Sequence, residues 1–169
     1  DGGASLEHES MVSCAGGQAY NFRRTPAWEK ADGEAVSLTI DGLLGGHSAA
    51  VMHLGRGNGL KLMARILATI AAKMPLSLAS FTGGAKMNAI VSEAKAVAVV
   101  PVGKAAEAME LAKNLAEEIK AELSVSDPGF RFACEWAQAD QVMTAEDSRA
   151  LITFLQLLPN GVRAMSQEM

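Results

Sequence analysis

The sequence is poor in cysteine and has no surplus of positive charge. Two cysteines, Cys14 and Cys134, in 169 residues are too few for a disulfide framework. We therefore expect two free, buried thiols in a reducing compartment. Lys and Arg number 15 against 19 Asp and Glu, so the chain lacks the basic face that binds nucleic acid. No apolar run approaches the roughly 20 residues that span a bilayer, and the first residues lack a signal peptide's apolar core. These absences predict a cytoplasmic domain that binds neither nucleic acid nor membrane.

The chain also lacks clustered metal ligands. His47 and His53 are six residues apart, whereas a helical zinc pair is about four apart with an intervening glutamate. Glu7, His8 and Glu9 adjoin one another, but such residues near a terminus are more often merely solvated. We predict no metal site within the chain.

What the chain does have is a periodicity typical of an α+β domain. Hydrophobic residues make up 49% and charged residues 20%, as in a soluble globular protein. Residues 35–40 alternate apolar and polar side chains, which predicts a half-buried strand, and further strands are predicted at 93–100 and 130–137. Leu76, Leu78 and Ser80 begin another strand, which Gly83-Gly84 is expected to break or bulge. Helical spacing predicts helices over 60–71 and 105–123, the second packing through Leu111, Leu115 and Ile119. Thr144 and Asp147 resemble the capping box of a C-terminal helix over 145–158.

This order predicts a ferredoxin-like fold. From Ala35 it reads β-α-β-β-α-β, which gives an antiparallel sheet with helices on one face, followed by the last helix. We expect residues 1–34 to be an extended lead-in and residues 35–169 to be the folded domain.

A glycine-rich corner, Gly42 to Ser48 (GLLGGHS), joins the first strand to the first helix. Its glycines allow close approach of the backbone to a ligand, and His47 can donate a hydrogen bond near neutral pH. The alternative is a plain turn in which His47 caps backbone groups. A P-loop is excluded, because His47 stands where its lysine is required. Asn58 is a plausible N-cap of the helix that follows.

Four motifs together resemble one family, the lid domain of aminoacyl-histidine (Xaa-His) dipeptidases, which are cytoplasmic di-zinc metallopeptidases that cleave dipeptides such as carnosine. The motifs occur in family order over nearly the whole chain: Ser13 to Gly17 (SCAGG), residues 40–67 (IDGLLGGHSAAVMHLGRGNGLKLMARIL), Phe81 to Gly84 (FTGG) with Asn88 to Ile90 (NAI), and Leu158 to Val162 (LPNGV).

The resemblance implies roles for two residues. His47 matches the lid histidine that stabilises the oxyanion formed at the scissile carbonyl. Asn88 matches the lid asparagine that hydrogen-bonds the C-terminal end of the substrate. Val91, Ala49 and Gly59 depart from the family pattern, which bears on local loop geometry and substrate preference.

The resemblance also implies that this chain is a lid excised from a longer enzyme, inactive by itself and lacking the last strands of the lid. The family's two zinc ions and their ligands belong to a separate catalytic domain. Asp1 lies nearest to the position of one zinc ligand, but the acidic residues usual around that ligand are missing, so we assign it no metal role. Expected partners are a dipeptide, the catalytic domain of the same chain and a second copy in a homodimer. The alternative function is a stand-alone ferredoxin-like module for binding or oligomerisation.

Overall fold

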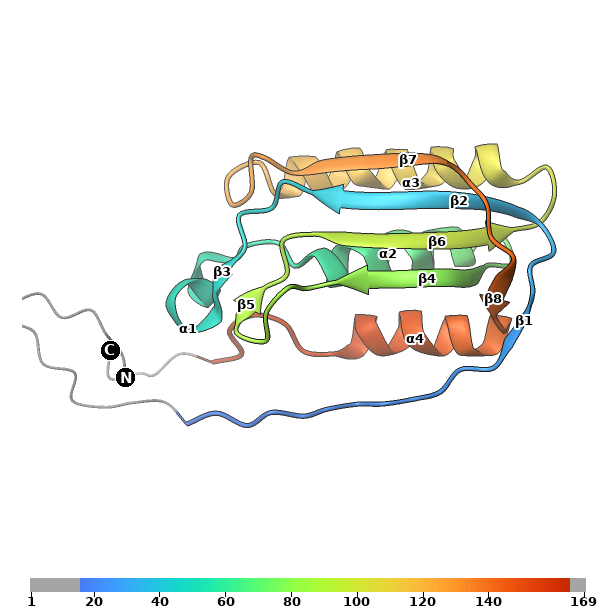
Figure 1. Ribbon diagram of the computed structural model, residues 1–169. Coiled ribbons are helices and arrows are strands. Elements are labelled where there is room, and N and C mark those ends of the chain that lie inside the picture. The colour runs from blue at the N-terminus through green and yellow to red at the C-terminus, as the bar shows by residue number, and fades with distance from the viewer. Residues whose placement is uncertain (1–15, 165–169) are drawn as a thin grey trace, which may run out of the picture.

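The structure, a computed structural model, describes residues 16–164. Its centre is a four-stranded antiparallel sheet in the order β4–β6–β2–β7. These strands are β2 (Glu34–Asp41), β4 (Ser77–Gly83), β6 (Ala94–Val100) and β7 (Arg131–Ala137). Helices α2 (Gly59–Ala71) and α3 (Ala105–Glu122) follow β2 and β6 in the chain and lie on one face of the sheet (Figure 1). The predicted ferredoxin-like α+β fold is confirmed.

The core lies between the sheet and these two helices. Alternate residues of β2, namely Val36, Leu38 and Ile40, are fully buried because a strand sends successive side chains to opposite faces. The apolar stripe of α2 is buried against them, and α3 contributes Leu115 and Ile119. Leu111 is partly buried and packs on the same cluster, so the predicted packing of α3 is confirmed.

Helix α4 (Ala145–Leu157) lies beside α2 and next to the edge strand β4 (Figure 1). Its N-cap is Thr144, whose hydroxyl accepts a hydrogen bond from the backbone N–H of Asp147 at 3.3 Å, as predicted. The predicted N-cap of α2 is also confirmed, because the Asn58 side chain accepts from the N–H of Leu60 at 3.1 Å. Strand β4 ends at Gly83, where the sequence predicted a break or bulge, and its irregularity lies between Leu78 and Ser80.

Two small two-stranded sheets were not predicted. Strand β1 (Trp28–Lys30) pairs with β8 (Gln141–Met143), and β3 (Gly46–His47) pairs with β5 (Ala89–Ile90). A short helix α1 (Ser48–Val51) and the 3-10 turn η1 (Met52–Leu54) follow β3 directly. The β3–β5 pair stands at one end of the main sheet and carries the glycine-rich corner (Figure 1).

Residues 16–27 are extended and run along α4 (Figure 1). Phe22 contacts Phe154 of α4 edge-on, with ring centroids 5.1 Å apart. The division of the chain at residue 34 stays a prediction. The expectations for Asp1, Glu7, His8, Glu9 and Cys14 fall outside the described residues.

Candidate functional site

The glycine-rich corner is shaped by backbone conformations that suit glycine. Gly46 has a φ of +116°, and a Cβ atom built there would lie 2.7 Å from the guanidinium Nη1 of Arg56. Any larger residue would therefore be strained and would displace Arg56. After this turn, the next residue, His47, lies in an exposed position directly before α1.

The β3–β5 pairing brings the two predicted site residues together. His47 is the register partner of Ala89, and the N–H of Ser48 donates to the carbonyl of Asn88 at 2.9 Å. The side chains meet as well, with His47 Nε2 and Asn88 Nδ2 at 3.2 Å. Residues 41 apart in the sequence thus form one exposed polar pair.

The hydrogen bonds of His47 define which ring nitrogen can donate. Nδ1 accepts from the backbone N–H of Ala49 at 3.2 Å, so in the neutral ring the proton resides on Nε2. An Nε2–H group needs an acceptor, and the Asn88 amide supplies one when its oxygen faces the ring, since the two amide orientations have nearly the same shape. Nε2 is therefore the donor that this pair can present to a ligand.

The structure also shows the capping role that the sequence offered as the alternative for His47. His47 is the N-cap of α1 through Nδ1, while Nε2 faces Asn88 and takes no part in the cap. Capping and ligand binding therefore use different ring nitrogens and can be separated by mutation.

The described residues provide no metal centre: across 16–164, no three His, Cys, Asp or Glu side chains are grouped so that they could hold a metal ion. A zinc site needs such a cluster of ligands. The exposed side chains of His47 and Asn88 offer hydrogen-bonding groups at this corner.

Cys134 is free and lies half-buried on β7, where full burial was predicted. Burial raises the pKa of its thiol, with Lys113 opposing the shift. Because the thiolate is the nucleophile, this environment makes the Cys134 thiol less reactive than an ordinary one.

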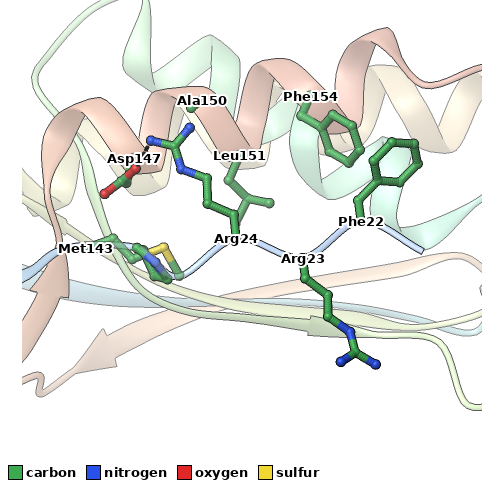
Figure 2. A pocket seen from close by; sticks show the side chains of 9 residues that line it. Phe22, Arg23, Arg24, Met143, Asp147, Ala150, Leu151 and Phe154 are labelled. Carbon is green, nitrogen blue, oxygen red and sulfur yellow. Dashed lines mark hydrogen bonds and ion pairs between the residues drawn. The ribbon is translucent and has the colours of Figure 1, made fainter. Parts of the chain in front are cut away.

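A separate groove of about 480 Å³ lies between the extended segment and α4. Figure 2 shows Arg24 reaching Asp147 across it, whereas Arg23 points away from the helix. The charge of Arg24 is paired with Asp147, and the lining of the groove is otherwise mainly apolar.

Sequence reasoning missed the residues that hold the corner in place. Asp127 is 1% exposed, and its carboxylate accepts hydrogen bonds from two backbone N–H groups of the corner region. Arg56 donates to the carbonyl of Gly45 at 2.6 Å. An aspartate before Pro-Gly is typical of an ordinary turn, so no local pattern marks it.

No helix among residues 16–164 is long and apolar enough to cross a membrane.

Comparison with known proteins places the chain among peptidase domains. A sequence profile described as the peptidase dimerisation domain matches residues 38–127, more than half of the chain. The cytosol non-specific dipeptidase of Escherichia coli (strain K12) is 35% identical over 161 residues, which cover 92% of this chain and 33% of the relative.

A solved structure agrees in fold as well as in sequence. The aminoacylhistidine dipeptidase of Vibrio alginolyticus is 36% identical with a TM-score of 0.79, and the match covers 86% of this chain and 30% of that one. The chain thus spans about a third of the length of these relatives. The predicted resemblance to the dipeptidases is confirmed, and the chain belongs to the peptidase dimerisation domain family.

Proposed function

We propose that this chain is the substrate-clamping lid of a cytosolic di-zinc dipeptidase that hydrolyses Xaa-His dipeptides. Support comes from the family match and from two relatives, one named as a cytosol non-specific dipeptidase and the other as an aminoacylhistidine dipeptidase. The name of the former relative, a non-specific dipeptidase, makes the breadth of substrates the first property to measure.

The observation that carries the proposal is the His47–Asn88 pair. His47 Nε2–H would donate to the oxyanion that develops at the scissile carbonyl, and the Asn88 amide would bind the C-terminal end of the dipeptide. A positioned donor of this kind is worth about 3 kcal/mol of transition-state stabilisation. The two side chains lie against each other, so a bound dipeptide would take over the hydrogen bond between them.

The remaining parts of the enzyme lie elsewhere. The two zinc ions would be held by a catalytic domain of the same chain, since the described residues do not suit a zinc site. Closure of the lid over that domain would complete the site, which makes a hinge motion part of the reaction cycle. The family's description as a dimerisation domain also supports a homodimer.

Replacing His47 in the full-length protein tests its role. We expect His47→Ala to lower kcat and kcat/KM together by about 10²-fold, because the lost hydrogen bond belongs to the transition state. His47→Asn restores a side-chain cap for the N–H of Ala49 without the imidazole, so it should recover stability but not activity.

Asn88→Ala should raise KM more than it lowers kcat, because Asn88 would bind the substrate in its ground state too.

His53→Ala is the matched control, since His53 is an exposed histidine of the same connection and should leave kcat unchanged. Steady-state rates with Xaa-His and other dipeptides, zinc content and thermal unfolding are measured for every variant. A kcat within about twofold of the parent for His47→Ala would remove His47 from the mechanism. The alternative function, a stand-alone module for binding or oligomerisation, predicts instead that the full-length protein hydrolyses no dipeptide.

A further inference from the structure

A buried carboxylate closes the loop that carries His47. Asp127 Oδ1 accepts from the N–H of Leu44 at 2.8 Å, and Oδ2 accepts from the N–H of Gly57 at 2.7 Å. These two N–H groups flank the segment that contains β3, α1 and η1. One side chain, 1% exposed, therefore joins both ends of the segment that presents His47.

The chemistry of this contact favours a charged acid. Both partners of the carboxylate are donors, so each oxygen must accept, and only an ionised carboxylate has two acceptor-only oxygens. An asparagine of the same shape would turn one N–H group toward another. Burying a carboxylate is costly unless it is hydrogen-bonded, and these two short bonds supply the compensation.

The backbone around Asp127 packs equally closely on the corner. Gly42 has a φ of +75°, and a Cβ atom there would lie 1.9 Å from the carbonyl oxygen of Gly129. The turn that contains Asp127 and Gly129 stands at the same end of the sheet as β3 (Figure 1). On the far side of the segment, Arg56 donates to the carbonyl of Gly45 at 2.6 Å and lies against Gly46.

We infer that Asp127, together with Arg56, is a positioning residue that fixes the glycine-rich corner and thereby aims His47 at the substrate. The inference rests on the proposed role of His47. Neither residue touches the reacting atoms in this assignment. Both act by restricting the segment that contains β3, through which His47 is paired with β5. A misplacement of about 1 Å in a catalytic group can cost 10²-fold in rate, so loosening this segment has a measurable consequence.

A double-mutant cycle in the full-length protein separates positioning from general stability. We expect Asp127→Asn to lower kcat by about ten- to a hundredfold while KM changes less, because the effect reaches the substrate through a transition-state donor. In the His47→Ala background, the same substitution should change kcat less than twofold, since the group it positions is already gone.

Ser148→Ala is the matched control. Its buried hydroxyl also accepts a hydrogen bond from a backbone N–H, that of Leu78 at 2.9 Å, but Ser148 belongs to α4. It should lower stability and leave kcat within twofold.

Each outcome decides one claim. A kcat for Asp127→Asn within twofold of the parent, or an equal loss with and without His47, overturns the inference while leaving the role of His47 intact. A normal kcat for His47→Ala overturns the proposed function itself, whatever Asp127→Asn does. If Asp127→Asn cannot be purified in folded form, the same cycle with Arg56→Lys, which keeps the charge but not the guanidinium geometry, decides in the same way.

Discussion

Asp147 joins two parts of the chain through one side chain, which has three partners. Its Oδ2 accepts from the N–H of Ala27 at 2.8 Å and from the Thr144 hydroxyl at 3.2 Å, and its Oδ1 pairs with Arg24. The Ala27 N–H, and after it Arg24 and Thr144, hold the pKa of this carboxyl below its usual range, while burial opposes the shift. The ionised form therefore ties the extended segment to the start of α4.

The depressed pKa predicts how Asp147 contributes to stability as pH changes. A carboxyl with a lower pKa in the folded state stabilises the fold above the unfolded-state pKa of about 3.9. That contribution is lost as pH falls through the lower, folded-state value. We expect Asp147→Asn to destabilise the domain at pH 7, with a difference from the parent that shrinks below about pH 4. Denaturant unfolding of both proteins between pH 7 and pH 2.5 measures the difference in their free energies of unfolding. A difference that does not change with pH would contradict a stabilising role for the ionised Asp147 carboxylate.

Single residues differed in how far the sequence predicted them. His47 and Asn88 could be named because each stands inside a motif. Asp127 and Arg56 could not, because their partners, Leu44, Gly57 and Gly45, are backbone groups. A backbone N–H or carbonyl carries no sequence signature, so its side-chain partner stays hidden until the loops are placed.

The C-terminal end of α4 is held by a lysine from another helix. Lys61 of α2 donates from Nζ to the carbonyls of Leu155, Gln156 and Leu158, at 2.9, 2.6 and 2.8 Å. The last carbonyls of a helix have no partner within it and carry partial negative charge, so an ammonium group satisfies both needs. Next to it, Asn58 Nδ2 donates to Asn160 Oδ1 at 2.8 Å, which ties residues after α4 to the start of α2.

We therefore expect Lys61→Met to lower the free energy of unfolding by about 1–2 kcal/mol, since the stem is kept and only the ammonium is lost. Lys73→Met, at an exposed lysine just after α2, is the control and should change it by less than about 0.5 kcal/mol. Urea unfolding of the isolated chain gives both values. Equal effects of the two substitutions would show that the helix end does not depend on Lys61.

Regular elements were predicted where they are long enough to show a period. Strand β2 and helices α2, α3 and α4 each bury one face, which leaves a clear alternation or a three-and-four spacing. Strands β3 and β5 have two residues each, too few for any period. The two strands are brought together by the tertiary fold around the glycine-rich corner, and their pairing places His47 next to Asn88.

Taken as a whole, the domain presents its candidate site at one end. The extended segment before β1 starts toward the same end of the sheet as β3 and β5, and the segment after α4 leads back to that end (Figure 1). The extended segment is held along α4 by the contact of Phe22 with Phe154 and the ion pair of Arg24 with Asp147.

The proposed function places the zinc ligands in a domain other than this one, which predicts how the isolated chain behaves toward zinc. Tight zinc binding needs three or four ligands held together, and residues 16–164 offer no such group. We expect the chain to retain less than about 0.1 zinc per molecule after dialysis and to hydrolyse no dipeptide with added zinc, because a lid supplies hydrogen bonds but no activated water. Elemental analysis and a dipeptide hydrolysis assay measure the two properties. About one tightly held zinc per chain would contradict the proposal, and repeating the analysis with His8→Ala and with His47→Ala would then locate the ligand.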